Sequence, residues 1–214
     1  MTNLLHSEEF AKLEVEYPFL RRAREHFAGL KSLSFVVVDT ETTGLEAATI
    51  EITEIAGLKV EKGEITDVFN ILINIGQPLP REIIRLTGIT DEMLLSGENK
   101  NSALRKFVAF IGGLPLFAHN TEFDLAFLNA HINKELVFTL TNQSVCTLML
   151  SRKLLPGLPS HRLGKVAEYF KIPTPLVHRA PGDVELAYQI WLKMAEILER
   201  EGIGSLEELI KLAA

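Results

Sequence analysis

From Ser34 onward, hydrophobic residues first occur in short runs that are typical of strands. The run SFVVVD is rich in β-branched residues and predicts a buried strand. Two further strand-like segments follow, ITEIAGLKV and EITDVFNILIN, with a turn expected between them at Lys62 and Gly63. Because the three segments are close in sequence, we expect them to be antiparallel neighbours in one sheet.

After Pro80 the hydrophobic pattern changes to helical spacing. Two helices are predicted, at REIIRL and at NSALRKFVAFI, and Gly112 and Gly113 end the second one. The remaining elements are a fourth strand, a helix, a short apolar stretch and two more helices: LPLFAH, TEFDLAFLNAHI, SVCTLML, HRLGKVAEYF and DVELAYQIWLKMAEILER. Three consecutive strands followed by alternating strands and helices predict an α/β domain, a mixed β-sheet flanked by helices.

The residues before this domain are predicted to form an N-terminal helical arm, at positions 1–33. Their spacing is helical, and Pro18 is expected to open a second helix because proline is tolerated in a first turn. The arm carries three closely spaced arginines: Arg21, Arg22 and Arg24. These arginines could follow a nucleic-acid backbone; the alternative is a helix packed on the domain with its arginines in solvent.

The main domain is expected at positions 34–200, followed by a short C-terminal helix at 201–214. In this last segment, Ser205 and Glu208 have the spacing of a capping box, in which the two side chains bond reciprocally to backbone N–H groups. We expect this helix to close the fold.

Composition and charge narrow the functional classes. The chain has 214 residues, of which 47% are hydrophobic, and this suits one folded domain with a substantial core. Its formal net charge is −6, whereas a protein that binds duplex DNA mainly by neutralising phosphates is usually basic. Any contact with nucleic acid should therefore be local.

Cysteine content and the N-terminal sequence bear on location. Cys146 is the single cysteine, so no internal disulfide can form, and the paired Cys and His spacing of a zinc site is absent from the sequence. The first residues lack the basic start and apolar core of a signal peptide, and no run approaches the roughly 18 apolar residues of a membrane span. We expect a cytoplasmic protein with no membrane attachment.

Two carboxylates stand at the end of the first strand, in VVVDTETTGLE. Asp39 and Glu41 are two positions apart, and side chains at this spacing project from the same face of a strand. Two carboxylates at one point repel each other unless a positive charge lies between them, and a divalent cation is the usual solution. The alternative is a polar strand end that leads into a Thr-Gly turn.

A second acidic position is Asp124, in LFAHNTEFDLAFLN. Asn120 or Thr121 can cap the helix that carries it, and its helical neighbours are largely apolar, so its carboxylate needs a partner. The alternative is an acid that only interacts favourably with the helix dipole, as many acids in first turns do.

The third candidate segment is HRAPGDVELAYQIW. His178 lies in a proline-bounded loop, and Asp183 is expected to open the long helix five positions later. This spacing brings an imidazole close to a carboxylate on a rigid element. The alternatives are that Asp183 only caps the helix after Gly182 and that the loop histidine is merely solvated.

Taken together, these segments occur in the order of a known pattern. The chain resembles the DnaQ-like exonucleases, especially the proofreading subunit or domain of bacterial replicative DNA polymerases. The resemblance extends from about Phe35 to Met194 and rests on five blocks: D-T-E-T-T-G-L at 39–45, I-x-E-I-A at 52–56, L-T-G-I-T at 86–90, H-N-x-x-F-D at 119–124 and H-x-A-x-x-D at 178–183.

This resemblance implies a ribonuclease H-like α/β fold and assigns roles to the matching positions. The metal ligands of the family correspond to four carboxylates: Asp39, Glu41, Asp124 and Asp183. The catalytic base corresponds to His178. A histidine at this place is typical of one branch of the family, since the other branch has a tyrosine four positions before the last aspartate, where this chain has Arg179.

The implied activity is metal-dependent 3′-to-5′ hydrolysis at the 3′ end of single-stranded or frayed DNA, which releases nucleoside 5′-monophosphates. Four carboxylates suit two cations about 3.5 to 4 Å apart, and all-oxygen ligands favour Mg²⁺ or Mn²⁺ over zinc. His178 would take a proton from the attacking water near neutral pH. Thr42 and Asn120 would contact the terminal nucleotide, and a DNA polymerase subunit is an expected partner.

Two other functions share parts of this pattern. An RNA 3′-end trimming exonuclease would use the same carboxylates and histidine, because the 2′-hydroxyl is read by residues outside these blocks. A non-catalytic nucleic-acid-binding subunit could keep the fold, but a broken acidic set would be its signature, and the set is intact here. One departure is Cys146, where several relatives have an aspartate before the threonine; we expect altered packing there.

Overall fold

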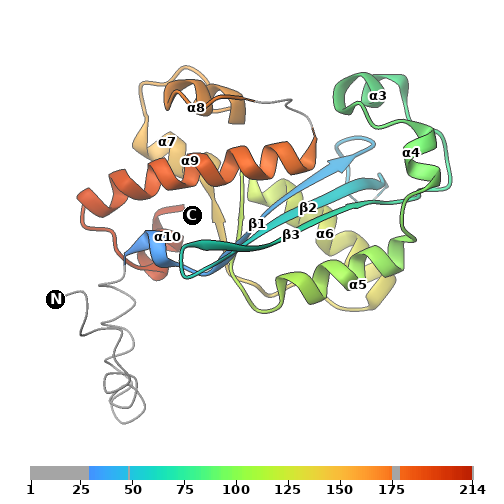
Figure 1. Cartoon of the computed structure of the whole chain (residues 1–214), viewed down its shortest axis with the longest axis horizontal. Helices are drawn as coiled ribbons and strands as arrows, with labels where there is room; N and C mark the ends of the chain where they lie inside the picture. Colours follow the sequence, from blue (N-terminus) through green and yellow to red (C-terminus); the bar gives the residue numbers. More distant parts are fainter. Residues whose placement is uncertain (1–28, 48, 175–178, 214) are drawn as a thin grey trace, which may run out of the picture.

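The computed structural model describes residues 29–47, 49–174 and 179–213. His178 and the three arginines of the expected arm lie outside this part of the chain. The centre of the domain is a five-stranded mixed sheet with helices on both faces (Figure 1). The strands are β1 (Phe35–Thr42), β2 (Ile52–Glu61), β3 (Glu64–Leu72), β4 (Leu116–Ala118) and β5 (Ser144–Cys146). The predicted fold class is confirmed.

The strand order across the sheet is β3-β2-β1-β4-β5. The first three strands are antiparallel neighbours, as expected, while β4 and β5 run parallel to β1. Lys62 and Gly63 form the turn between β2 and β3 with φ angles of 54° and 84°. Positive φ at both central residues matches the right-handed twist of a hairpin. A side chain at Gly63 would collide with the backbone oxygen of Lys31.

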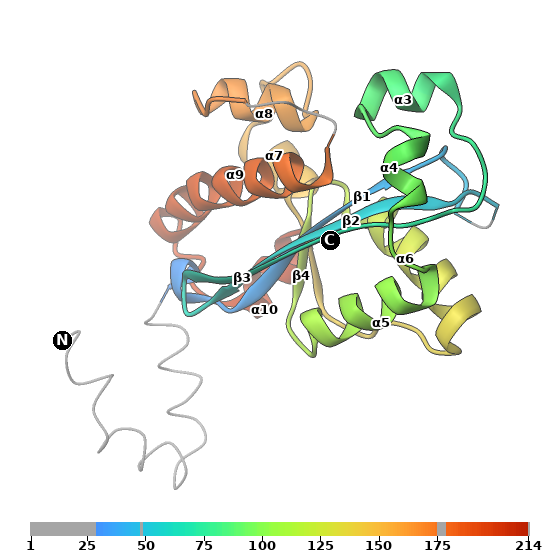
Figure 2. The ribbon, with the colours of Figure 1, turned by 45° about the vertical axis from the view of Figure 1, so that its right-hand side comes forward.

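Helices cover the sheet in two layers, which Figure 2 shows from a second direction. One face is covered by α7 (Thr147–Leu154), α8 (Leu163–Tyr169), α9 (Ala180–Arg200) and α10 (Leu206–Ala213). The opposite face is covered by α5 (Lys100–Ile111) and α6 (Thr121–Leu136). The shorter elements are a 3₁₀ turn, η1 (Leu30–Ser32), and two helices, α3 (Arg81–Thr87) and α4 (Asp91–Leu95). Among the described residues, no helix is long and apolar enough to cross a lipid bilayer.

Alternation along β1 divides the core between these two layers. Phe35 and Val37 belong to the hydrophobic cluster beneath α9, whereas Val36 and Val38 belong to the cluster beneath α5 and α6. This is the period-2 pattern of a strand buried on both faces. Trp191 of α9 is fully buried, and its ring centroid lies 5.9 Å from that of Phe35. Burying one such side chain stabilises the fold by about 1.5 to 3 kcal/mol.

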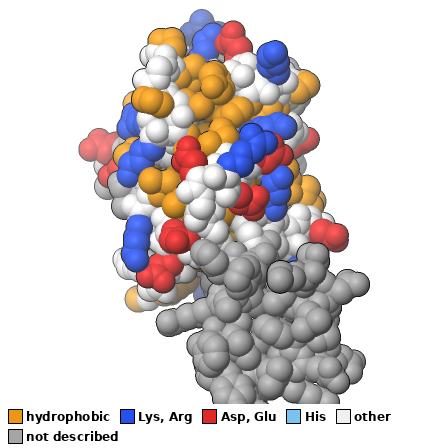
Figure 3. All heavy atoms as spheres, turned by 90° about the vertical axis from the view of Figure 1, so that its left-hand side faces the viewer, with side chains coloured by type: hydrophobic (Ala, Val, Ile, Leu, Met, Phe, Trp, Pro, Cys, Tyr) orange, Lys and Arg blue, Asp and Glu red, His pale blue; other side chains and the backbone are white. Residues whose placement is uncertain are grey.

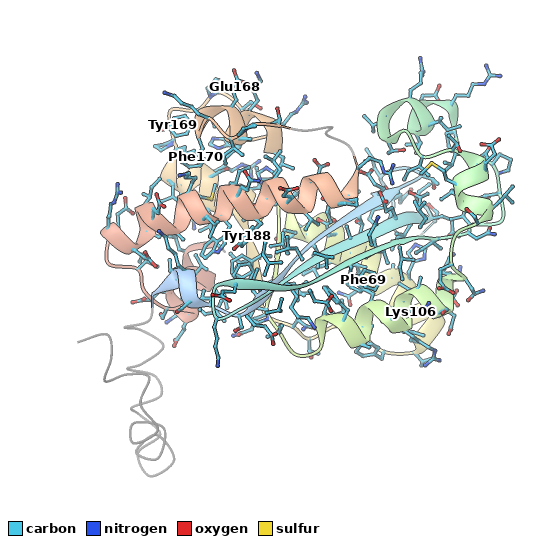
Figure 4. All side chains as sticks on the ribbon, in the orientation of Figure 1. Phe69, Lys106, Glu168, Tyr169, Phe170 and Tyr188 are labelled. Carbon is cyan, nitrogen blue, oxygen red and sulfur yellow. The ribbon has the colours of Figure 1, made fainter. Side chains whose placement is uncertain are left out.

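Aromatic contacts hold the helices of both layers against the sheet (Figure 4). On the α9 side, the ring of Tyr188 lies 6.4 Å from that of Phe35. On the other side, Phe69 of β3 contacts Phe107 and Phe110 of α5, with ring centroids 5.6 and 5.2 Å apart. The long helix α9 is therefore fixed along the sheet by side chains well away from its first turn.

The predicted capping box at the start of α10 is confirmed. Glu208 N–H donates to Ser205 Oγ at 3.3 Å, and Glu208 Oε2 accepts from Ser205 N at 3.1 Å. Leu209 and Ala213 of α10 are buried in the cluster beneath α9. The helix α4 is absent from our sequence prediction; Thr90 caps it by accepting a hydrogen bond from Met93 N.

Candidate metal centre

The carboxyl end of β1 carries the first two candidate ligands. β1 pairs with β2 along its whole length, but it pairs with β4 only at Val36 and Val37, so its last residues extend beyond β4. Phe35 and Val37 face α9, and the alternation of a strand places Asp39 and Glu41 on that same face. The prediction that both carboxylates project from one face is consistent with this register.

The third carboxylate comes from α9, whose first turn lies beside the end of β1 (Figure 1). Carboxylate oxygens of Asp39, Glu41 and Asp183 all lie within 4.8 Å of one another. The prediction that Asp183 opens this helix is wrong by three residues, because α9 begins at Ala180 and Asp183 lies within its first turn. The alternative that Asp183 caps the helix is also wrong, because the N-cap residue is Arg179. Pro181 sits in the first turn, where its missing N–H costs nothing.

Asp124 approaches from the other side of β1. The helix α6 starts directly after β4, and Asp124 lies in its first turn with only 3% of its surface exposed. Its Oδ1 accepts hydrogen bonds from Thr40 N at 3.0 Å and from Thr40 Oγ1 at 2.8 Å. Asp124 is not one of the three carboxylates within 4.8 Å of one another, but its charge acts on Asp39.

The expected side-chain cap of α6 is wrong. Asn120 occupies the N-cap position with φ 81°, in the left-handed region that asparagine tolerates, and its side chain makes no capping hydrogen bond. The hydroxyl of Thr121 is used elsewhere, since it donates to Ala118 O and Val145 O at 3.1 and 3.0 Å. This hydroxyl ties β4 to β5 rather than capping the helix.

Burial raises the pKa of three of these carboxylates, and neighbouring negative charges raise it further for Asp39 and Glu41. Burial raises the pKa of Asp39 well above its ordinary value, and the charges of Asp124 and Asp183 add to the increase. Burial raises the pKa of Glu41 from 4.5 to about 8, and Asp183 adds to this as well. Burial also raises the pKa of Asp124 from 3.8 to about 7, although the hydrogen bonds from Thr40 oppose the increase. Negative charge is therefore unfavourable at this point without a cation.

The residues present fit a divalent cation. Three carboxylates from two elements converge, a fourth lies behind the strand, and their negative charges repel one another. A divalent cation between them removes this repulsion, and an all-oxygen donor set suits hard ions such as Mg²⁺ and Mn²⁺.

The comparison with protein families decides what kind of site this is. A family model described as "Exonuclease" matches residues 36–191, which contain all four carboxylates. The chain belongs to the exonuclease family. It is therefore a hydrolytic enzyme, and this family is generally dependent on divalent metal ions.

Individual relatives of this exonuclease are DNA polymerase III proteins. It is 37% identical over 180 residues to the DNA polymerase III subunit epsilon of Aquifex aeolicus, which covers 84% of this chain and 89% of that protein. It is 40% identical over 181 residues to the PolC-type DNA polymerase III of Bacillus subtilis. In that case the match covers 84% of this chain and only 13% of the much longer relative.

Solved structures show that the fold of this exonuclease is shared. Exonuclease X in complex with 5′ overhanging duplex DNA matches with a TM-score of 0.65 and 22% identity, over 84% of this chain and 99% of that one. The zinc-bound complex of E. coli exonuclease I with single-stranded DNA matches with a TM-score of 0.68 and 17% identity. That match covers 80% of this chain and 42% of the other.

The two predicted substrate contacts of the exonuclease differ in exposure. Thr42 is buried, and its Oγ1 donates to Gly44 O at 2.6 Å, so the hydroxyl holds the turn after β1. Asn120 is exposed at the start of α6, between β4 and the helix that carries Asp124. Contact with a nucleotide stays a prediction for both residues.

Sequence reasoning missed two residues beside the carboxylates of the exonuclease. Glu54 of β2 is fully buried, and it forms an ion pair with Arg179, whose Nη2 lies 2.8 Å from Glu54 Oε1. The signal was available in the block I-x-E-I-A, because a glutamate within an otherwise apolar strand must have a partner. The sequence alone does not identify Arg179 as this partner, since the two residues are 125 positions apart.

A further missed feature is a histidine, directly after β4, that contacts the start of α7 and the segment before α8. His119 Nδ1 lies 3.0 Å from Thr147 Oγ1, and His119 Nε2 donates to His161 O at 2.8 Å. Burial lowers the pKa of His119 to about 4, so its ring is neutral at physiological pH. Thr147 follows Cys146, so this contact lies next to the position where we expect altered packing from the sequence.

Proposed function

We propose that this exonuclease removes nucleotides from the 3′ end of single-stranded or frayed DNA and releases nucleoside 5′-monophosphates. The observation that carries the proposal is the convergence of Asp39, Glu41 and Asp183 within 4.8 Å, with Asp124 behind the same strand. In this proposal the four carboxylates hold two Mg²⁺ or Mn²⁺ ions. The names of the relatives support DNA as the substrate, since two are DNA polymerase proteins and two were solved with DNA.

Bound cations would activate a water molecule and stabilise the charge on the scissile phosphate and on the leaving oxygen. The chain's own residues would do the rest. Asp39 and Glu41 present their carboxylates from a strand paired on both sides near its start, so they reorganise little during the reaction. Asp183 contributes from the first turn of α9, and Asp124 is held by Thr40.

His178 is proposed as the base that accepts the proton of the attacking water. It lies outside the described residues, so its support is the sequence block that ends at Asp183 and the ordinary pKa of imidazole, about 6.5. Thr42 and Asn120 are proposed contacts to the terminal nucleotide. The catalytic unit is proposed to be residues 34–200.

Surface charge supports a local rather than extended contact with nucleic acid. Figure 3 shows one face of the molecule, on which acidic and basic side chains are interspersed among apolar ones instead of forming a continuous basic surface. With a formal net charge of −6, the protein would attract DNA weakly over long distances. A short single-stranded end that reaches the carboxylates fits this distribution.

A polymerase partner and a cytoplasmic location belong to the same proposal. They are supported by the name of the Aquifex aeolicus relative, a DNA polymerase III subunit that matches along 89% of its length. Co-elution of the protein with a replicative polymerase subunit from the source cell, tested by size-exclusion chromatography, would support the partnership; separate elution at micromolar concentrations would contradict it.

The proposal is tested on a 5′-labelled single-stranded DNA oligonucleotide and on RNA of the same sequence, with Mg²⁺ or Mn²⁺. We expect a ladder that shortens from the 3′ end, faster on DNA, and loss of this ladder in Asp39→Ala and His178→Ala. Asp67→Ala is a matched control, since Asp67 is an exposed aspartate on the edge strand β3 of the same sheet.

Each other outcome of this assay has a definite meaning. Faster digestion of RNA would replace DNA hydrolysis by RNA 3′-end trimming. Inactivity on both polymers, or activity that survives both substitutions, would overturn the catalytic assignment and favour a binding subunit. Calorimetric titration with Mn²⁺ would count the cations, and a single bound ion would contradict the two-metal proposal.

A further inference from the structure

Glu54 is a further carboxylate on the face of the sheet where Asp39, Glu41 and Asp183 converge. In the antiparallel pair of β1 and β2, it lies directly opposite Glu41. Side chains directly opposite each other project from the same face, with Cβ atoms about 5 Å apart. Glu54 is also completely buried, and an isolated buried carboxylate is strongly unfavourable. Its position therefore requires a compensating partner.

Three hydrogen bonds satisfy this carboxylate. Arg179 Nη2 donates to Glu54 Oε1 at 2.8 Å, and Arg179 Nε donates to Glu54 Oε2 at 3.1 Å. The backbone N–H of Ala180 also donates to Oε2, at 3.3 Å. The two parallel bonds from the guanidinium are the bidentate geometry that only arginine provides. Because both oxygens are occupied, Glu54 is set apart from the three carboxylates that converge.

One of these bonds, from the backbone N–H of Ala180, caps the start of α9. The first N–H groups of a helix have no partner within the helix, and the helix dipole favours a negative charge there. The N-cap residue of α9 is Arg179, which makes no capping hydrogen bond with its own side chain. Glu54 supplies both the acceptor and the charge from a different element. The first turn of α9 is thereby attached to β2 at the strand position that faces Glu41.

We infer that Glu54 and Arg179 act as a positioning pair that holds the first turn of α9 against β2 and so sets the place of Asp183 beside Asp39 and Glu41. This inference rests on the proposed function. Asp183 lies three residues after Ala180, in the turn that the pair anchors. His178 directly precedes Arg179 in the sequence, so the proposed base is next in the chain to the anchored residue.

Arg179 has a second effect on the same group. Its charge lowers the pKa of Glu41, against the increase that burial and the neighbouring acids cause. Its side chain is one-third exposed, whereas that of Glu54 is fully enclosed. Removing the guanidinium would therefore leave an uncompensated buried charge next to the ligands as well as a loosened helix start.

The experiment measures cation binding and catalysis separately in Glu54→Gln, Arg179→Lys and the double variant Glu54→Gln/Arg179→Met. Glu54→Gln keeps the shape of the side chain but removes its negative charge. Arg179→Lys keeps the positive charge but cannot form the two parallel hydrogen bonds of the guanidinium. We expect Mn²⁺ affinity, measured by calorimetry without nucleic acid, to fall by about tenfold or more in each variant, as residues that orient metal ligands commonly show. We expect kcat to fall similarly, with KM for DNA changed by less than about threefold.

Two features separate positioning from a general loss of structure. The Mn²⁺ affinity and kcat of the double variant should be no lower than those of the more impaired single variant, because both changes remove the same interaction. Raising the Mn²⁺ concentration should restore part of kcat. The matched control is Glu196→Gln, which removes the ion pair between Lys31 and the same helix α9, and it should keep wild-type Mn²⁺ affinity and kcat.

The inference is overturned if the folded variants bind Mn²⁺ as the wild type does, even if their melting temperatures fall, because that is a structural role only. If Glu54→Gln and the double variant do not fold, the Mn²⁺ affinity of Arg179→Lys alone decides whether the pair positions Asp183. A wild-type protein that binds Mn²⁺ but cuts neither DNA nor RNA would refute the proposed function, and the Mn²⁺ affinities would still decide the positioning role. A wild-type protein that binds no Mn²⁺ would overturn both.

Discussion

Asp39 and Glu41 lie on a strand, whereas Asp124 and Asp183 lie on helices, and the two pairs are held in different ways. The strand pair is positioned by the backbone, because β1 hydrogen-bonds to β2 through both residues. Each helix residue depends on contacts made by individual side chains: Asp124 on Thr40, and the first turn of α9 on Glu54 and Arg179. The ladder of backbone hydrogen bonds between β1 and β2 fixes both the direction of a side chain and the face from which it projects. A residue at the start of a helix needs a specific side-chain contact to fix its position.

This difference predicts which substitutions act on catalysis alone and which also loosen the structure. Replacing a carboxylate on β1 removes charge without disturbing the ladder, since the ladder uses only backbone atoms. Replacing an anchor of a helix start should displace a carboxylate that is itself unchanged. The four predictions below test this contrast, beginning with the largest expected effect.

The variant Asp39→Asn should lose exonuclease activity by about 1,000-fold, or about 4 kcal/mol of transition-state stabilisation. It should remain folded, and in EDTA it should melt at a higher temperature than the wild type. The reason is that one of several mutually repelling acids has been neutralised. Kinetic assays and thermal melts with and without Mg²⁺ check both parts. A destabilised variant would mean that Asp39 holds the fold and would remove the contrast between the strand and helix carboxylates.

Metal-free protein should lose stability as the pH rises. The pKa of Glu41 is raised from 4.5 to about 8 and that of Asp124 from 3.8 to about 7, so the folded state retains protons that the unfolded state has released. This contribution is complete below about pH 4 and is lost as the pH rises through about 7 to 8, at up to about 1.4 kcal/mol per pH unit for each group.

Urea denaturation at pH 5 to 8, in EDTA and in Mg²⁺, measures the slope of the unfolding free energy against pH. Cations should flatten it, because they stabilise the charged carboxylates. The variant Glu41→Gln should reduce the slope in EDTA, since one of the titrating groups is gone. Equal slopes in EDTA and Mg²⁺ would contradict a cation site among these residues.

The variant Thr40→Val should lower kcat by about tenfold, which corresponds to a hydrogen bond to a charged group of about 1.5 kcal/mol. Valine keeps the shape and the backbone N–H donor but removes the hydroxyl that donates to Asp124 at 2.8 Å. Thr40→Ser keeps the hydroxyl and is the matched control. Wild-type kinetics in Thr40→Val would show that the backbone N–H of residue 40 is sufficient to hold Asp124.

The smallest effect is expected at a helix start far from the four carboxylates. Ser205→Ala removes the capping box of α10 and should cost about 1 kcal/mol of stability. Exonuclease activity of the folded protein should not change, because α10 packs against β5 and α7 rather than α9's first turn. Chemical denaturation and a kinetic assay test this, and reduced kcat would imply that the C-terminal helix communicates with the site.

The elements that the sequence predicted well are those with local physical causes. The β-branched run before Asp39 predicts a strand whatever its neighbours are, and Ser205 with Glu208 predicts a capped helix from its own spacing. The grouping of Asp39 with Glu41 follows from the period of a strand. All of these depend on residues a few positions apart.

The features that were missed depend on contacts between distant segments. The start of α9 was expected at Asp183, but the helix begins at Ala180, where Glu54 of β2 provides the acceptor. The hydroxyl of Thr121 bonds to Val145 O, which no local pattern indicates. Sequence spacing alone could not identify either partner.

The separation of Glu54 and Arg179 by 125 positions also governs when the protein can become active. A contact between such distant residues requires closure of a long loop, so it forms late in folding. During translation the strand with Asp39 and Glu41 emerges well before α9, and a growing chain that ends before residue 179 contains neither Asp183 nor the arginine that anchors its helix. Nascent chains are thus expected to stay inert toward nucleic acid near the ribosome, and nuclease activity begins only after nearly the whole domain has been synthesised.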